Sequence, residues 1–555
     1  MNKNIIKVLF AMSVLLPIML NAQNLPNRTY GGTLSERAHA LVQSGGESVN
    51  YIMAGFTTMP LDTNILVVRI DSAGNVLQAK IGYGQYTEIA TSMIKTISEP
   101  GYILTGWTRD FGGQARKANI FVIKLNLDLS VAWGRIYSSA GAYEDRAYSI
   151  IELSPVLAPT GGYAVVGWTE SATPQPGLVL MQLDLSGNQV ATRIYHRRTW
   201  WQPSPILTPT EGYDLVEVLP APNVPAGGLA ITGRTMHPMY PGTYDAFTML
   251  VNHTGSVVWF ITITGTYDDE GYSIIFDNDP AGPFVVSAGW TNSFGPGTGG
   301  GAQGPANVFI WKISILGIEL WKNAYGLETG DEKLMDEQGL LRTTDGNYVI
   351  AGWTNSTGPG IPNSNFWMMK VMSNGIIMWS KAHPSIPGSG NEQAFPIIET
   401  FSSMGAPTGY AVAGWTDSPE FVIGQEDFHF VTLDPTGSRP RCVLEAPVAM
   451  LTIPYSEPET AVFYIEPFDY TIITLRDTIV QSHEICGSVD TNDVGPTGIF
   501  FTPSSPFDST DIVIPSAYLY NYGNTTVSYT AQMDIGSFYS GTYNVVNHAP
   551  QTTIQ

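Results

Sequence analysis

The segment GYAVVGWT, from Gly162 to Thr169, decides the fold because close copies of it recur along the chain. In each copy, apolar and small residues alternate as in a half-buried strand, which ends on a three-residue anchor. The anchors are GFT at Gly55, GWT at Gly106 and Gly167, GRT at Gly233, and GWT at Gly289, Gly352 and Gly414. Seven copies at a spacing of about 60 residues predict a repeat architecture.

Three further strands are predicted around each anchor. One precedes it, as at Tyr148 to Leu153, and another follows it, as in NIFVIKLN from Asn119 to Asn126. A turn glycine comes next, and then a strand that often carries tryptophan, as at Trp133. Four strands per repeat, seven repeats and no helical segment predict an all-β fold, a seven-bladed β-propeller over residues 23–438.

The two ends of the repeat region complement each other. The last repeat lacks a fourth strand after Gly437, whereas Asn24 to Tyr30 precedes the first repeat. We therefore expect the N-terminal segment to complete blade seven. This closure pairs the strand edges that an open ring would expose.

The order of a Gly-Tyr strand, GWT, a strand ending in Lys-Leu-Asp, and then Gly and Trp resembles the β-propeller repeats of secreted bacterial surface proteins. The resemblance covers about residues 24–438. It implies a secreted or cell-surface bacterial protein but no particular ligand, because one fold serves many functions.

The N-terminus and the charge constrain location and partners. Lys3 and Lys7 precede an apolar run that ends near Ala22, as in a secretory signal peptide over residues 1–22. A membrane anchor is the alternative, but that run is shorter than the roughly 20 residues of a span, and we expect no membrane span elsewhere. The formal net charge of −22 argues against nucleic acid as a partner.

Composition changes after Ser438. Residues 439–490 form a Pro-rich connector that holds the only two cysteines, Cys442 and Cys486. We predict a disulfide between them in an oxidising compartment, with two reduced thiols as the alternative. In residues 491–555 an Asp-Val-Gly opening at Asp493 leads to a strand that ends in Asn-Tyr-Gly-Asn at Asn521. This pattern resembles adhesion-type immunoglobulin-like modules, which implies a β-sandwich. Its roughly 65 residues predict an incomplete module, with a surface-anchoring C-terminus missing.

An acidic residue recurs two positions before a small residue in five repeats. These acids are Glu36, Glu88, Asp145, Asp269 and Glu392. Carboxylates are preferred ligands of Ca²⁺, so a ring of them can hold this metal, and we predict no other cofactor. The alternative, which we favour, is that each acid accepts hydrogen bonds within its own blade.

Blade four departs from the pattern. It has Thr210 in place of the acid, a lengthened loop reading HRRTWWQPSPILTPTEG, and arginine in its anchor. The candidate ligand-binding residues are His196, Arg197, Arg198, Trp200, Trp201, Arg234, His237, Tyr240 and Tyr244. Aromatic planes and guanidinium groups suit sugar rings that carry carboxylate or sulfate. The alternative is a degenerate blade whose tryptophans pack between its neighbours.

No residue is predicted to be catalytic, because metalloprotease and hydrolase motifs are absent from the sequence. We predict a non-enzymatic exported surface protein for binding, adhesion or scaffolding, with an extracellular glycan or protein as ligand. The alternative is a propeller enzyme that uses the central channel, either a quinoprotein-like oxidoreductase or a polysaccharide-acting hydrolase or lyase. An enzyme is expected to gather ionisable groups from several blades, whereas a binding module presents an aromatic patch.

Overall fold

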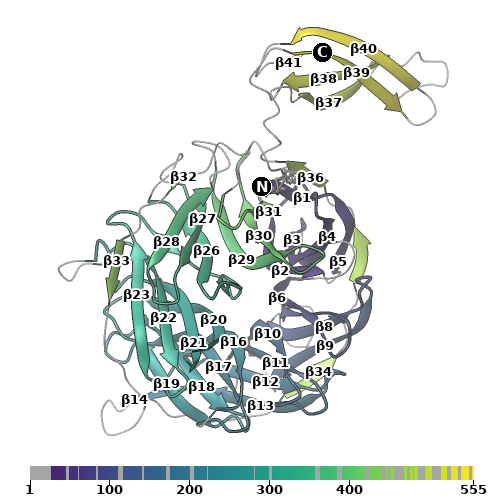
Figure 1. Cartoon of the computed structure of the whole chain (residues 1–555). Coiled ribbons are helices and arrows are strands. Elements are labelled where there is room, and N and C mark those ends of the chain that lie inside the picture. The colour runs from purple at the N-terminus through teal and green to yellow at the C-terminus, as the bar shows by residue number, and fades with distance from the viewer. Residues whose placement is uncertain are drawn as a thin grey trace, which may run out of the picture.

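A ring of seven β-sheets makes up most of the molecule (Figure 1). The computed structural model describes residues 27–438, apart from 45–48, 61, 83–85, 110–116, 140–142, 171–174, 200–205, 222, 281, 299–302, 357–362, 384–389, 420–421 and 423, and beyond them the strands between 446 and 554. All regular elements in this described part are strands, so it offers no apolar helix of membrane-spanning length. The prediction of an all-β, seven-bladed propeller is confirmed.

Each blade begins with the strand nearest the ring axis and continues outward. Blade one has β2 (Glu36–Ser44), β3 (Asn50–Thr58), β4 (Thr63–Asp71) and β5 (Val76–Gly82); blade two has β6 (Glu88–Thr96), β7 (Gly101–Thr108), β8 (Asn119–Leu125) and β9 (Val131–Ser139). Blade three has β10 (Asp145–Glu152), β11 (Tyr163–Thr169), β12 (Gly177–Leu183) and β13 (Gln189–Tyr195); blade four has β16 (Thr210–Val218), β17 (Gly228–Met236), β18 (Tyr244–Asn252) and β19 (Val257–Ile263).

Blades five to seven continue the same order. Blade five has β20 (Asp269–Asp279), β21 (Gly282–Thr291), β22 (Asn307–Ser314) and β23 (Glu319–Gly326). Blade six has a divided inner strand, β24 (Glu332–Lys333) and β25 (Leu340–Arg342), then β26 (Tyr348–Thr354), β27 (Asn365–Val371) and β28 (Ile377–His383). Blade seven has β29 (Glu392–Phe401), β30 (Pro407–Thr416), β31 (Asp427–Leu433) and, from the N-terminus, β1 (Asn27–Gly31).

The ring closes as expected, because β1 pairs antiparallel with β31. The Tyr30 hydroxyl then donates a hydrogen bond of 2.7 Å to the carbonyl of Gly74, the turn glycine of blade one. Tyr137 makes the same bond to Gly187 in blade three, where the turn glycine has a φ of 76°. The closing junction therefore uses the same contact as an ordinary junction between blades.

The anchor glycine has a steric cause that all seven blades share. A Cβ atom on Gly167 would lie 1.9 Å from the carbonyl oxygen of Arg146 in the inner strand, where the register between β10 and β11 shifts. The other six anchor glycines meet an inner-strand carbonyl at 1.9 to 2.2 Å. Only glycine lets the second strand approach the inner strand this closely.

Gly167→Ala is therefore expected to lower the free energy of unfolding by about 3 kcal/mol or more, because backbone has to move. Gly32→Ala is the matched control, since a Cβ there meets only the Glu36 side chain at 3.6 Å. Urea unfolding of both variants checks this expectation. Equal stability of the two variants would contradict the steric explanation.

Five short strands after residue 438 extend the blades outward (Figure 1). They are β32 (Ala446–Pro447) on blade six, β33 (Leu451–Pro454) on blade five, β34 (Phe468–Thr471) on blade two, β35 (Leu475–Thr478) on blade one and β36 (Gln481–Glu484) on blade seven. Cys442 and Cys486 lie outside the described residues.

The strands nearest the C-terminus form two separate sheets. One contains β37 (Val494–Thr502), β38 (Ile514–Asn521) and β41 (Thr553–Ile554), and the other contains β39 (Val527–Ile535) and β40 (Tyr539–His548). The region is thus β-structured, and its assignment as an immunoglobulin-like sandwich stays a prediction.

Candidate functional site: the mouth of the central channel

The predicted acids lie at the mouth of the channel, each at the start of an inner strand and opposite the threonine of its own anchor. The pairs are Glu36 with Thr57, Glu88 with Thr108, Asp145 with Thr169, Asp269 with Thr291 and Glu392 with Thr416. Thr57 Oγ1 donates to Glu36 Oε1 at 2.6 Å, and the five carboxyl groups are at most 3% exposed. Such contacts are those expected if each acid accepts hydrogen bonds within its own blade and does not bind a metal.

Blade six has the same acid in register, which the sequence reasoning missed. Glu332 pairs with Thr354, whose Oγ1 donates to its carboxylate at 2.8 Å. Within the described ranges, no group of three or more His, Cys, Asp or Glu residues is placed to hold a metal ion. Calcium at the acid ring stays a prediction.

A second recurring residue, the first or second of the third strand, pairs with the same threonine. It is Asn64, Asn119, Gly177, Asp245, Asn307, Asn365 and Asp427 in blades one to seven. A Cβ on Gly326 would lie within 3 Å of both the Asn307 and the Glu332 side chains. Asn307 of blade five therefore lies near Glu332, the acid of blade six. Asparagine supplies an amide donor there, whereas Asp245 and Asp427 add a second acid.

Arg197 meets Asp245 from the lengthened loop of blade four. It lies in the hairpin of β14 (Arg197–Thr199) and β15 (Ile206–Thr208), is 3% exposed, and places Nη1 2.8 Å from Asp245 Oδ2. The buried His237 ring has Nε2 3.9 Å from the same carboxyl group. Arg197 therefore points into the fold, where it balances an acid that four other blades replace with asparagine.

The other predicted binding residues divide into three groups. His196 is buried, and burial lowers the pKa of its imidazole. Arg198 is placed only by its backbone pairing with Leu207, and Trp200 and Trp201 lie outside the described residues. The exposed Tyr240 ring lies 4.8 Å from His237, centroid to centroid. The structure thus brings part of the predicted set together and buries His196, Arg197 and His237.

Arg234 joins blades four and five at the mouth. Its guanidinium lies 3.1 Å from Glu211 and 2.9 Å from Glu270, and 4.3 Å from the ring centre of Tyr244. Two carboxylates and an aromatic face therefore surround one half-buried cation.

Similar cation–aromatic contacts recur around the mouth. Arg37 lies 4.2 Å from the ring centre of Trp415, Arg146 lies 4.5 Å from Trp107, and Lys333 lies 3.8 Å from Trp290. In each pair the cation follows the acid of one blade and contacts the anchor aromatic of the preceding blade. We call these three pairs and Arg234–Tyr244 the cation–aromatic rim. For the first three pairs the sequence signal was a basic residue directly after the acid, and for Arg234 it was the arginine in the anchor.

The channel behind the rim is crossed by residues 334–339, which interrupt the inner strand of blade six. Gln338 contacts the Leu41 amide of blade one at 3.4 Å and the Met93 carbonyl of blade two at 3.2 Å. Its own carbonyl accepts from Ile397 of blade seven, and the Glu337 carbonyl accepts from Ser273 of blade five. This segment, the channel plug, is thus bonded to four other blades.

Buried acids gather where the plug meets blades one, four and five. Asp336 lies 3.1 Å from His39, and Asp214 accepts hydrogen bonds from Ser149 and the Ile274 amide. Burial raises the pKa of Asp214 to about 8 and also raises the pKa of Asp336. Burial raises the pKa of Glu337 as well, and the neighbouring charge of Asp336 raises it further. Ionisable groups from several blades therefore converge, but they are almost inaccessible to solvent.

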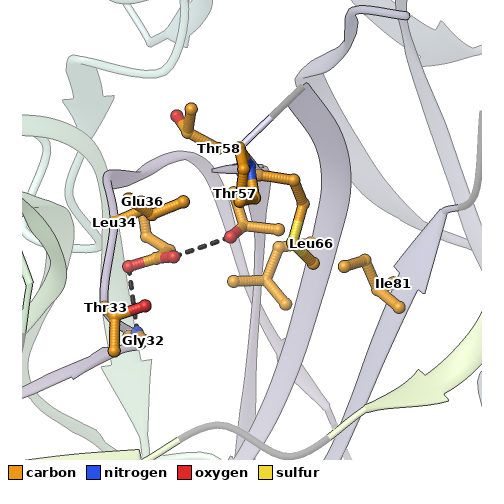
Figure 2. A pocket seen from close by; sticks show the side chains of 11 residues that line it. Gly32, Thr33, Leu34, Glu36, Thr57, Thr58, Leu66 and Ile81 are labelled. Carbon is orange, nitrogen blue, oxygen red and sulfur yellow. Dashed lines mark hydrogen bonds between the residues drawn. The ribbon is translucent and has the colours of Figure 1, made fainter. Parts of the chain in front are cut away.

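A pocket of about 310 Å³ lies at the junction of blades seven and one (Figure 2). Leu34, Leu66 and Ile81 supply apolar walls, and the carboxyl group of Glu36 faces the space between Gly32 and Thr57. Burial raises the pKa of Glu36. The pocket can enclose a small, largely apolar molecule that carries one hydrogen-bond donor for the Glu36 carboxyl group. The sequence reasoning missed it because the N-terminal strand supplies part of its wall.

Comparison with known proteins gives no family. No protein-family model matches the chain, and no curated protein matches its sequence. Among solved structures, Sqt1 of Chaetomium thermophilum is 7% identical, covering 74% of this chain and 98% of its own, with a TM-score of 0.35. A mutant of Synechocystis apocarotenoid oxygenase is 10% identical (80% and 98% covered, TM-score 0.39), and the exotype rhamnogalacturonan lyase YesX is 10% identical (72% and 90%, 0.23). At such TM-scores none of these similarities bears on function.

Proposed function

We propose that this chain is a non-enzymatic, exported binding protein of a bacterial surface whose channel mouth binds an acidic glycan. The observation that carries the proposal is the cation–aromatic rim, in which four blades hold a cation against an aromatic ring. Trp107 and Tyr244 are partly exposed, whereas Trp290 and Trp415 are buried beneath their cations. Indole and phenol planes stack on sugar rings, and guanidinium binds carboxylate or sulfate. A C-terminal immunoglobulin-like module suits adhesion or scaffolding.

Arg146 is the most informative rim residue to replace. Its guanidinium lies between two indoles, 4.5 Å from Trp107 and 5.6 Å from Trp168, and it is 27% exposed. Loss of one desolvated cation from a binding surface costs on the order of 1.4 kcal/mol, which is a tenfold change in affinity.

We expect Arg146→Ala to weaken binding to sulfated or uronate-containing glycans by about tenfold while leaving neutral glycans unaffected. Arg135→Ala is the matched control, because Arg135 lies on the outer strand β9 and bonds the Ser186 carbonyl at 2.8 Å. Glycan arrays followed by calorimetry on the best ligand make the comparison. Equal glycan binding by both variants would exclude the cation–aromatic rim as the binding site. If the protein binds only a protein partner and no glycan, the proposed ligand is wrong.

The converging channel acids are the observation on which the alternative function, a polysaccharide hydrolase or lyase, would rest. Asp336 and Glu337 are neighbouring buried carboxyl groups whose raised pKa values suit a proton donor, so they are the candidates for the general acid. This function requires that the plug move, because Asp336 is only 2% exposed. Chain-shortening of an acidic polysaccharide by the purified protein, lost in Asp336→Asn, would support it over binding alone.

A further inference from the structure

The five short strands after residue 438 follow one path around the outside of the ring. The chain builds blades one to seven in order and then adds β32 to blade six, β33 to blade five, β34 to blade two, β35 to blade one and β36 to blade seven. This order retraces the ring in the opposite direction (Figure 1). Residues 455–467, between β33 and β34, lie outside the described residues.

The two ends of this path arrive at neighbouring blades and at the same height. His383 of β28 and Tyr30 of β1 each pair with the phenylalanine near the start of their third strand, so the two outer strands can be compared position by position. Ala446 lies opposite Ala382, one residue before His383. His483 lies opposite Thr29, one residue before Tyr30. The path therefore begins and ends side by side.

The cysteines flank these two ends in the sequence. Cys442 is four residues before β32, and Cys486 is two residues after β36. Six extended residues reach roughly 20 Å, so only short segments separate the cysteines from two strands that lie on neighbouring blades. The pairing predicted from composition thus has a topological reason.

We propose that β32 to β36 act as a belt along the outer edges of five blades and that a Cys442–Cys486 disulfide joins its two ends into a covalent hoop. The two thiols release two protons and two electrons to form the S–S bond, and a disulfide oxidant such as oxidised glutathione accepts them and becomes two thiols. This step needs the oxidising compartment of an exported protein. The hoop keeps the outer edges paired and prevents blade seven from separating from blade one.

Hydrogen exchange on the unmodified chain tests the belt. The outer strands β5, β9, β23 and β28 carry a belt strand, whereas β13 and β19 carry none within the described residues. We expect outward-facing amides of the first group to exchange at least ~10-fold more slowly than those of β13 and β19, which serve as internal controls. Similar exchange in both groups would overturn the belt.

The closure has its own readout. Peptide mapping without reduction is expected to yield one linked pair containing Cys442 and Cys486, and mild reduction is expected to accelerate exchange in the belted strands. Two free thiols in protein oxidised with a glutathione couple, or a linked pair whose reduction leaves exchange unchanged, would overturn the hoop. Glycan binding does not depend on this bond, so a failure here is distinguishable from failure of the proposed function.

Discussion

Arg197→Ala is expected to lower the free energy of unfolding by about 3–5 kcal/mol and to have this effect without any ligand. The substitution removes the guanidinium 2.8 Å from Asp245 and leaves that carboxylate buried near Asp269. Breaking a buried ion pair by removing one partner carries a cost of this size. Denaturant unfolding, compared with Arg135→Ala on the outer strand, measures the effect.

A second substitution identifies the cause. Blades one, two, five and six have asparagine where blade four has Asp245, so Asp245→Asn introduces the residue that these four blades use. We expect the double variant Arg197→Ala/Asp245→Asn to recover most of the lost stability. If the double variant is as unstable as Arg197→Ala, the loss comes from packing and not from an uncompensated charge.

The stability of the protein is expected to fall as the pH rises from about 4 to about 8. Burial raises the pKa of Asp145 to about 6, of Glu332 to about 7 and of Asp214 to about 8. Between these values and the unfolded pKa near 4, the folded protein holds protons that the unfolded chain has released. Raising the pH therefore favours unfolding, by about 1.4 kcal/mol per pH unit for each such proton.

Several groups act in the opposite direction and reduce the slope. Burial lowers the pKa of Lys124, Lys322 and Lys333, which opposes the trend at the alkaline end. Burial lowers the pKa of His196, so this group acts in the other direction below about pH 6.5. The pKa of Asp345 is lowered to about 2, mainly by its hydrogen bond with Lys370, and this shift affects stability only in stronger acid. Urea midpoints at pH 4 to 8 measure how steeply the stability depends on pH. Asp214→Asn removes one of the retained protons, so the stability of this variant is expected to depend less steeply on pH. A flat or rising profile in the unmodified protein would contradict the expectation.

The anchors and the ring could be predicted because they are local and repeated. GWT marks a position where a Cβ meets a backbone carbonyl, and this steric requirement recurs seven times in the sequence. Ring closure was equally visible, since blade seven lacked one strand. The divided inner strand of blade six was not, because residues 334–339 interrupt its pattern, and Glu332 was therefore missing from the predicted acids.

The site was harder to predict because its partners are distant in sequence. A cluster of basic and aromatic residues in blade four suggested a ligand surface, but nothing near Arg197 indicates that Asp245 accepts its charge. The belt left no periodic signal either, since strands of two to four residues are too short for one, and they pair with β-strands up to about 450 residues away.

The pairing of β1 with β31 constrains the order in which the strands can fold during synthesis. Synthesis proceeds from the N-terminus, so Asn27 emerges early, yet its partner His429 follows 402 residues later and the β36 edge later still. Blades one to six pair mostly with neighbours and can form in turn, while β1 must wait unpaired. Such long-range pairing is slow and leaves strand edges open to aggregation. A nascent chain of this protein is thus most vulnerable just before its last strand arrives.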